Sequence, residues 1–369
     1  MAFEAPRPGV GPHALDLIKP SVRAQPGYTL AALDAGRKLN QNESPYDLPD
    51  ALKREIVERV ARAPWPRYPE FVPARLLERL AEWFRWPADG ILAGNGSNEL
   101  IQATLAVTVE PGDAVVAPAP TFSLYRVLTA VSGGRYLAVP LDDAFQYDMD
   151  RLIGVAVRER AKVVVLNSPN NPTGTVLPAG AVERVLAETG ALVLCDEAYV
   201  DFGGPDAMDV LAASDRVVVL RTFSKALGMA GLRFGVGLAH PGVAREIAKA
   251  KLPYNVNLFT LTAAEVALEH MDVRQDLVSR IIATRDRAFP RLSALKGLTV
   301  YPSAANFFLV RFHSAAPGEV YRRLLQDHDI LVRDVSAVPG LEQCLRISVG
   351  TDGDMVAVER ALAEILGEG

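Results

Sequence analysis

The segment VVVLNSPNNPTG at residues 163–174 joins an unbroken apolar run to a polar turn. A run of valine and leucine without polar alternation is typical of a strand that is buried on both faces, as in a parallel sheet covered by helices. Further runs of this kind occur at residues 114–117, 191–195, 217–220 and 234–238. Helical patterns lie between them, for example at residues 98–107 and 179–188, so the middle of the chain is predicted to alternate strand and helix.

The length of 369 residues exceeds that of one typical domain and favours two. After Pro253 the pattern changes to a long helical region at 261–295, then to strand-like segments at 306–312 and 344–349 that flank a helix at 317–328. The expected fold is α/β, with a large domain whose mainly parallel sheet is flanked by helices and a smaller α+β domain. The expected bounds are 1–44 for an N-terminal arm that joins the small domain, 45–260 for the large domain and 261–369 for the small domain.

The composition narrows the range of partners. A net charge of -5 leaves no general basic field for nucleic acid or an anionic membrane, so small metabolites are expected as partners, and no metal is expected. No apolar run approaches the length of a membrane span, and the N-terminus lacks the pattern of a signal peptide. Cys195 and Cys344 are far apart, which favours buried free thiols and a cytoplasmic location.

Polar residues follow three of the predicted strands at the point where each strand ends. They are the turn at 167–174, the residues from Asp196 to Tyr199, and the segment 222–225, which ends in Lys225. Ligand sites of open parallel sheets lie at these carboxyl ends, so one pocket is expected to collect all three groups.

Lys225 and Asp196 are the residues most indicative of chemistry. A single lysine is usually a surface charge, but one drawn into a desolvated pocket loses its proton more easily and can condense with an aldehyde. Asp196 is either a turn or cap residue, or a carboxylate that keeps a pyridine nitrogen protonated. Asn171 and Tyr199 could bond a ring oxygen, or could be a turn residue and a core residue.

The segment GNGSNE at residues 94–99 precedes a helical pattern and offers backbone N–H groups to an anion. Glu99 occupies the third glycine position of the dinucleotide fingerprint, which argues against a nicotinamide cofactor. Thr222, Ser224 and Arg233 could bind the same anion, although Arg233 could equally form a structural ion pair.

Taken in order, SPNNPTG at 168–174, DEAY at 196–199 and Ser224-Lys225 followed by Arg233 resemble the fold-type-I pyridoxal-phosphate (PLP) aminotransferases. Further segments, spread over nearly the whole chain, resemble the histidinol-phosphate aminotransferases of this group. They are NQNESPY at 40–46, RYPE at 67–70, TFSKA at 222–226 with GLR at 231–233, and CLRISVGT at 344–351.

The resemblance implies a role for each candidate cofactor residue. Lys225 would form the Schiff base and carry the substrate proton, Asp196 would pair with the pyridine nitrogen, and Asn171 and Tyr199 would contact the ring oxygen. Phe122 would stack on the ring. The cofactor phosphate would be held by Ser97, Asn98, Thr222, Ser224 and Arg233.

The resemblance also implies how the substrate is bound and how the subunits assemble. Tyr68 falls where a tyrosine reaches into the neighbouring subunit's site, which implies a homodimer with composite active sites. Arg346 would bind the substrate carboxylate, with Arg333 as a second anion ligand. Many family members have a tyrosine after the N-terminal Lys-Pro, where this chain has Ser21, and Tyr28 is a candidate replacement.

The reaction implied is transamination from glutamate to imidazole-acetol phosphate, which gives 2-oxoglutarate and histidinol phosphate. Two alternatives share the cofactor residues: an aromatic or broad-specificity aminotransferase, and a threonine-phosphate-type decarboxylase. A PLP-binding regulator is a further alternative from another class, but it would need an added DNA-binding module for which the chain leaves no room.

Overall fold

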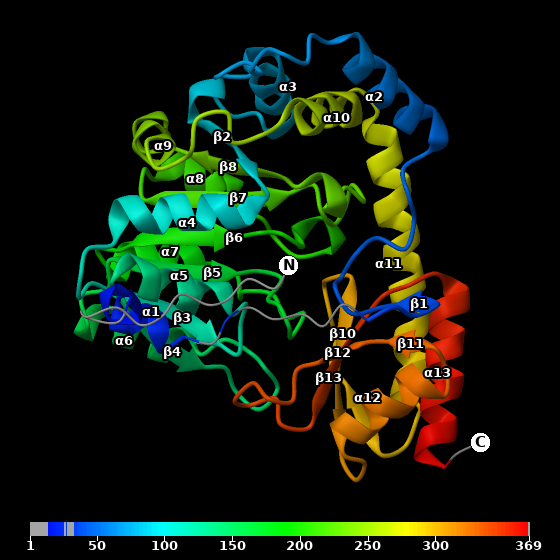
Figure 1. The fold of residues 1–369 in the computed structure, drawn as a ribbon. Coiled ribbons are helices and arrows are strands. Elements are labelled where there is room, and N and C mark those ends of the chain that lie inside the picture. Colours follow the sequence, from blue (N-terminus) through cyan, green and yellow to red (C-terminus); the bar gives the residue numbers. More distant parts are fainter. Residues whose placement is uncertain (1–13, 26, 28–32, 368–369) are drawn as a thin grey trace.

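The computed structural model describes residues 14–25, 27 and 33–367 (Figure 1). Its centre is a seven-stranded sheet in the order β2-β8-β7-β6-β5-β3-β4. All neighbouring strands are parallel except for the pairs that involve β8, which is antiparallel to both β2 and β7. The strands are β2 (Ile91–Asn95), β3 (Ala114–Ala119), β4 (Arg135–Pro140), β5 (Val163–Asn167), β6 (Leu192–Asp196), β7 (Val217–Thr222) and β8 (Phe234–Ala239).

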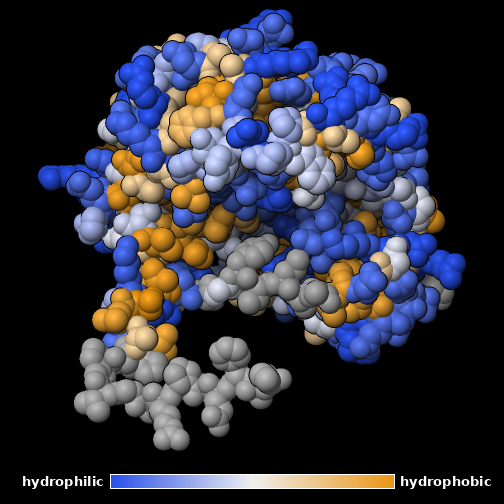
Figure 2. Space-filling model, turned by 45° about the horizontal axis from the view of Figure 1, so that its top comes forward, coloured by the Kyte–Doolittle hydropathy of each residue, from blue (hydrophilic) through white to orange (hydrophobic). Residues whose placement is uncertain are grey.

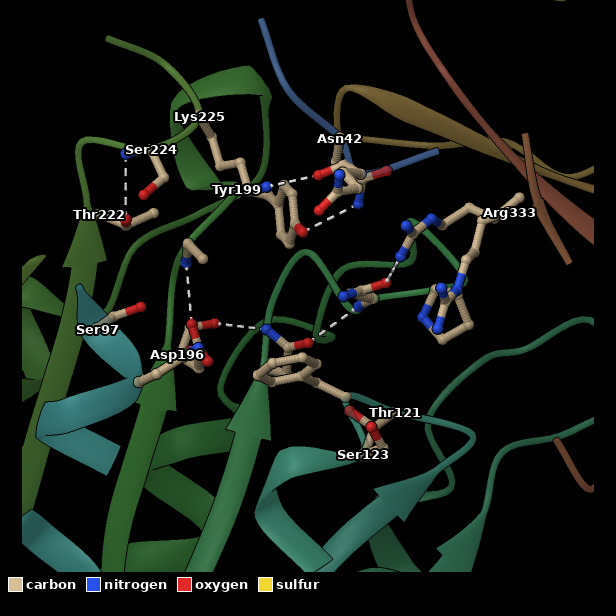
Figure 3. A pocket seen from close by; sticks show the side chains of 18 of the residues that line it. Asn42, Ser97, Thr121, Ser123, Asp196, Tyr199, Thr222, Ser224, Lys225 and Arg333 are labelled. Carbon is tan, nitrogen blue, oxygen red and sulfur yellow. Dashed lines mark hydrogen bonds between the residues drawn. The ribbon is translucent and has the colours of Figure 1, made fainter. Parts of the chain in front are cut away.

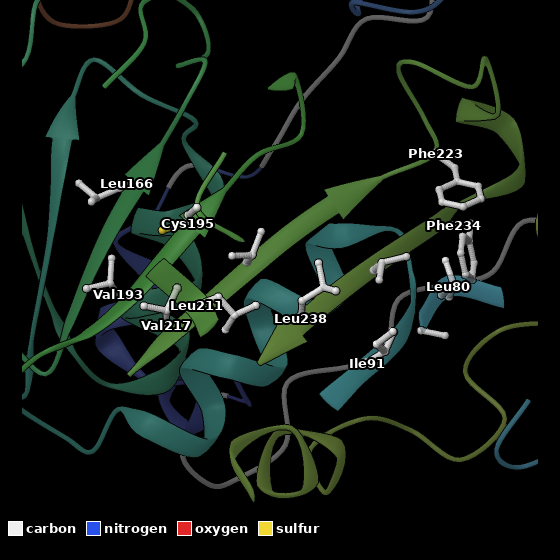
Figure 4. Close-up of a cluster of buried hydrophobic side chains, with 14 of the residues drawn as sticks. Leu80, Ile91, Leu166, Val193, Cys195, Leu211, Val217, Phe223, Phe234 and Leu238 are labelled. Atoms are coloured by element: carbon white, nitrogen blue, oxygen red, sulfur yellow. The ribbon is translucent and has the colours of Figure 1, made fainter. Parts of the chain in front are cut away.

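Both faces of this sheet are buried, as the apolar runs predict. In β5, Val164 and Leu166 face one core, part of which Figure 4 shows, whereas Val163 and Val165 face the other. The first core is covered by α6 (Met149–Arg158), α7 (Ala181–Glu188) and α8 (Met208–Ala213), and the second by α4 (Ser97–Thr108), α5 (Leu124–Ser132) and α9 (Pro241–Ala248). The α/β fold with a mainly parallel sheet is confirmed.

A second, antiparallel sheet has the order β12-β13-β10-β9. Its strands are β9 (Leu298–Val300), β10 (Phe307–Phe312), β12 (Arg333–Asp334) and β13 (Cys344–Ser348). Its core is shared with α11 (Met271–Ser293), α12 (Pro317–Gln326) and α13 (Asp352–Leu366). The N-terminal segment reaches this part of the molecule because β1 (Arg37–Lys38) pairs with β11 (Ile330–Leu331).

Three helices cover the β2 end of the large sheet: α2 (Asp50–Arg62), α3 (Ala74–Phe84) and α10 (Leu258–Glu269) (Figure 1). The helical region predicted at 261–295 is therefore two helices, α10 and α11, which are separated at His270. The buried side chains of α10 belong to the core of the large sheet. The domain bounds stay a prediction, and this packing favours an end of the large domain near His270 in place of residue 260.

The start of the described chain lies against the large sheet's helices. The short helix α1 (Pro20–Arg23), which follows η1 (Ala14–Leu17), contacts α5, where Lys19 Nζ donates to Val131 O at 2.9 Å and Ser21 Oγ donates to Ala130 O at 3.2 Å. Within the described residues of the predicted arm at 1–44, the segment 19–21 thus contacts the large part, whereas β1 pairs in the smaller one. Within the described residues, no helix is long and apolar enough to cross a membrane.

Candidate active site

A cavity of about 260 Å³ lies at the carboxyl ends of β5, β6 and β7, where the three predicted polar segments come together (Figure 3). Residues 40–42 and the strands β12 and β13 close its other side. The predicted site residues that line it are Ser97, Asn98, Phe122, Asn171, Asp196, Tyr199, Thr222, Ser224, Lys225, Arg233, Arg333 and Arg346.

Lys225 follows the end of β7, and its amine points into the cavity (Figure 3). Nζ donates to the backbone oxygen of Gln41 at 2.9 Å. The Lys225 side chain as a whole is only partly buried, but protein atoms surround its amine. This burial, together with the positive charge of Arg346, lowers the pKa of Lys225 to about 7. A large fraction of the amine is therefore neutral and nucleophilic at physiological pH.

Asp196 ends β6 with only 4% of its surface exposed. Burial raises the pKa of Asp196, and two hydrogen bonds oppose this rise: the Tyr125 hydroxyl donates to Oδ2 at 2.6 Å and the Ala198 N–H donates to Oδ1 at 3.1 Å. Burial and the nearby Asp196 charge raise the pKa of Tyr125 well above its usual range, so that this hydroxyl stays protonated. Tyr125 thus supports the anionic form of a buried carboxylate.

A candidate anion site lies at the start of α4, formed by Gly96, Ser97, Thr222, Ser224 and Arg233, and is called the Gly96 cradle below. The helix begins after Gly96, which has a φ of 76° and provides no capping side chain. A Cβ at Gly96 would lie 2.4 Å from Arg233 Nη2, and a Cβ at Gly235 would lie 2.2 Å from the backbone nitrogen of Ser97. Both glycines therefore allow the guanidinium and the neighbouring strand to approach the helix N-terminus closely.

The hydroxyl and guanidinium groups of the cradle come from the segment after β7. Arg233 Nη1 donates to Ser224 Oγ at 3.3 Å and to Ala230 O at 3.1 Å, and the Ser224 N–H donates to Thr222 Oγ1 at 3.2 Å. Together with the N-terminus of α4, these groups form a site suited to a phosphate dianion.

Arg333 and Arg346 stand on the opposite wall. They are direct neighbours in the β12–β13 register, which places both side chains on one face of the small sheet. Arg346 Nη1 donates to Asn171 Oδ1 at 2.6 Å, and Nη2 donates to Asn40 O at 2.7 Å. Its guanidinium carbon lies 5.5 Å from the centre of the Phe307 ring. The cavity therefore has cationic groups at both ends.

The sequence matches the family Aminotransferase class I and II over residues 36–365. The chain belongs to this family. The histidinol-phosphate aminotransferase of Chlorobaculum parvum is 37% identical over 337 residues, which cover 90% of this chain and 94% of that protein. The enzyme of the same name from Chlorobium phaeovibrioides is 38% identical over 353 residues, which cover 95% of this chain and 97% of that protein.

A solved structure agrees with these relatives. The histidinol-phosphate aminotransferase from Sinorhizobium meliloti, in complex with pyridoxal-5'-phosphate, superposes with a TM-score of 0.86 at 27% identity and covers 95% of this chain and 97% of its own. The predicted resemblance, the aminotransferase activity and PLP as the cofactor are confirmed. The site fits this cofactor, because the Gly96 cradle suits a phosphate and Lys225 and Asp196 suit its aldehyde and ring nitrogen.

Several residues of this aminotransferase site carried no predicted role. Tyr125 lies one helical turn after Phe122, and the two rings meet edge to face at 5.6 Å. Asn167 links two predicted site residues, since its Nδ2 donates to Asp196 O at 2.9 Å and its Oδ1 accepts from the Asn171 N–H at 2.9 Å. A tyrosine at helical spacing from Phe122 was the only sequence signal for Tyr125, and such spacing is more often that of a core residue.

Residues 40–42 also lacked assigned roles, although they begin the NQNESPY segment. Backbone oxygens of Asn40 and Gln41 accept from Arg346 and Lys225, and Asn42 Nδ2 donates to the Tyr199 hydroxyl oxygen at 3.0 Å. One short segment therefore contacts three predicted site residues.

Among the described residues, one predicted site residue does not line the cavity. Tyr68 is 79% exposed and stacks on Tyr254 with ring centres 4.5 Å apart. Tyr28 lies outside the described residues. Ser21, which stands where many relatives have a tyrosine, bonds the end of α5 and does not line the cavity.

Proposed function

We propose that the protein transfers an amino group between histidinol phosphate and 2-oxoglutarate, giving imidazole-acetol phosphate and glutamate, as a step of histidine biosynthesis. The observation that carries this proposal is the pair Arg333 and Arg346 on the wall opposite the Gly96 cradle. The cradle suits the phosphate of the cofactor, so the arginine pair provides a second anion site for the substrate. The names of the curated relatives support the same reaction.

Lys225 and Asp196 have different roles toward the bound cofactor. Bound pyridoxal phosphate supplies an aldehyde that condenses with amines and a ring that accepts electrons from the substrate Cα. Lys225 Nζ, whose pKa lies at about 7, would accept the proton that leaves the substrate Cα and would return it at the aldehyde carbon of the cofactor. Asp196, whose anionic form is supported by donors from Tyr125 and Ala198, would hold a proton at the ring nitrogen.

The arginine pair must accept two kinds of anion, because glutamate offers carboxylates and histidinol phosphate offers a phosphate ester. A guanidinium fork binds both through paired N–H groups. Asn171 and Asn40 hold the Arg346 guanidinium at the cavity wall. This support fixes the plane in which the fork can meet a substrate anion.

Substrate turnover tests the proposal. Purified protein loaded with pyridoxal phosphate is incubated with histidinol phosphate and 2-oxoglutarate, and separately with aromatic amino acids and 2-oxoglutarate, while glutamate formation is measured. We expect the higher kcat/KM with histidinol phosphate. A higher kcat/KM with aromatic amino acids would favour the broad-specificity aminotransferase, and carbon dioxide release without a 2-oxo acid would favour the decarboxylase.

We further propose that the enzyme is a cytoplasmic homodimer with composite sites. Hydrophobic patches lie between hydrophilic areas on the face that Figure 2 shows, and a cluster of exposed rings supports the dimer. In this cluster, Tyr68 and Phe71 pack against Tyr254, and Trp65 is 72% exposed nearby in the chain. Clustered exposed aromatic side chains are typical of protein interfaces.

A further inference from the structure

Asn42 is a buried residue in the segment that closes the cavity. It is 1% exposed and has a left-handed backbone with a φ of 53°. Its backbone N–H donates to Ser348 Oγ at 2.8 Å, and its backbone oxygen accepts from Asn306 Nδ2 at 3.0 Å. Its side chain accepts at Oδ1 from Ser348 Oγ at 3.1 Å and donates from Nδ2 to the Tyr199 hydroxyl oxygen at 3.0 Å.

These contacts determine the direction of each hydrogen bond. Ser348 Oγ accepts from the Asn42 N–H, so its single proton is available for Asn42 Oδ1. With the Ser348 hydroxyl donating to Oδ1, the amide oxygen faces Ser348 and the NH₂ group faces Tyr199. Because an amide nitrogen only donates, the Tyr199 oxygen is the acceptor in that bond, and the phenol proton points away from Asn42.

We propose that Asn42 is a positioning residue that orients the Tyr199 hydroxyl as a donor toward the ring oxygen of the bound cofactor. The proposal rests on the function proposed above. Tyr199 lies beside Lys225, whose Nζ is 5.8 Å from the centre of the tyrosine ring. Both residues line the same cavity (Figure 3).

A donor at the ring oxygen has a defined effect on Lys225. The hydroxyl stabilises negative charge on that oxygen, and the oxygen then holds a proton at the Lys225 nitrogen less tightly. Loss of the donor should therefore raise the pH at which this nitrogen loses its proton in the loaded enzyme. The other charged groups that act on Lys225 are Arg346, Glu43, Arg233 and Lys38, and none of them changes in the variants proposed below.

The test is a pH titration of the visible absorbance of the loaded enzyme, which follows the proton at Lys225 Nζ. In Asn42→Asp the carboxylate can only accept, so it takes the Tyr199 proton away from the cofactor. We expect the midpoint pH of this titration to rise by about 1 to 2 pH units, which corresponds to the loss of one hydrogen bond to a charged group. The charge of the new carboxylate raises the midpoint as well, so this shift needs a control.

Two controls separate orientation from charge. The first is Gln41→Glu, which adds a carboxylate at the adjacent cavity residue and should shift the midpoint less than Asn42→Asp. The second repeats Asn42→Asp in a Tyr199→Phe background, where no hydroxyl is left to orient. A shift that largely disappears in that background supports the proposal. An equal shift with and without the hydroxyl would overturn it.

A neutral variant covers the case in which Asn42→Asp does not fold. Ser348→Ala removes the hydroxyl that fixes the Asn42 amide and changes no charge. It should raise the midpoint by roughly 0.5 pH unit, and only when Tyr199 is present. No shift would count against the proposal. A wild-type protein that shows no titrating visible band with pyridoxal phosphate would instead refute the proposed function.

Discussion

At the scale of single residues, burial determines the reactivity of the site. Lys225 and Asp196 are both removed from water, which favours a neutral amine and would also favour a neutral carboxyl. Asp196 receives two donors that counter this tendency, from Tyr125 and Ala198. The site therefore combines an amine that can attack with a carboxylate whose anionic form is supported by two hydrogen bonds.

The pKa of Lys225 predicts how the ligand-free protein captures its cofactor. Below pH 7 the amine is mostly protonated and cannot attack the aldehyde, so capture should slow down about tenfold per pH unit. Above pH 7 the contribution of this amine to the rate of cofactor capture should no longer increase. The measurement is the rate at which visible absorbance grows after mixing with pyridoxal phosphate, with Lys225→Ala as the blank. A contribution that keeps rising to pH 10 would mean that Lys225 behaves as an exposed lysine.

Tyr125→Phe is predicted to lower kcat by about ten- to a hundred-fold with little change in KM. The substitution removes one donor from the buried Asp196 carboxylate, which then holds the ring-nitrogen proton less well. Tyr147→Phe is the matched control, because this buried hydroxyl donates to the backbone oxygen of Asn167 and does not contact Asp196. If both variants had the same kcat, the hydroxyl of Tyr125 would have only a structural role.

At the scale of elements, the strands and the helix N-terminus carry the binding groups to fixed places. The carboxyl ends of β6 and β7 deliver Asp196 and the segment that ends in Lys225. The start of α4 lies against β8, so the backbone of Ser97 and the side chain of Arg233 lie close enough to bind one anion together.

Gly96→Ala should weaken the affinity for pyridoxal phosphate by about ten-fold or more. The new Cβ meets the Arg233 guanidinium at 2.4 Å and also strains a backbone with a φ of 76°. Gly112→Ala is the matched control, since Gly112 has a φ of 93° and open space around its Cβ position. It should lower the melting temperature and leave the Kd for the cofactor unchanged. Equal cofactor affinity in both variants would refute the assignment of the cofactor phosphate to the Gly96 cradle.

Arg346→Lys tests the small sheet as the substrate anion site. An ammonium cannot reproduce the paired N–H groups of a guanidinium, so kcat/KM should fall for glutamate and for histidinol phosphate by about 2 to 4 kcal/mol in transition-state binding. The cofactor should still bind. A loss for glutamate alone would assign the phosphate to Arg333 or Tyr28, and no loss for either substrate would remove Arg346 from the site.

At the scale of the whole molecule, the cavity joins two parts of the chain. The large sheet provides the cofactor groups, and the small sheet together with residues 40–42 provides the opposite wall. Tyr68 lies outside its own cavity and is exposed, so it is available to a second copy of the chain.

Subunit mixing tests the composite sites. We expect Lys225→Ala and Tyr68→Ala each to be inactive or severely impaired. Hybrid dimers of the two should regain activity, because one of the two sites then has both residues intact. The measurement is activity after subunit exchange, with each parent alone as the control. No recovery despite proven exchange would argue against the composite site.

The sequence by itself determined the local features of this protein. Uninterrupted apolar runs marked β5, β6 and β7, and the polar residues at their ends identified Asp196 and Lys225, because strand burial and strand ends are properties of short segments. The family motifs added Arg346. Such patterns do not give strand direction, so the antiparallel run of β8 was not predicted.

Only the tertiary structure decided which distant residues meet. It placed Tyr125 against Asp196, residues 40–42 against Lys225 and Tyr199, Arg333 beside Arg346, and α10 on the large sheet. These contacts join positions that are far apart in the chain, and no local period encodes them. They follow from packing whole elements so that apolar faces are buried and buried polar groups find partners.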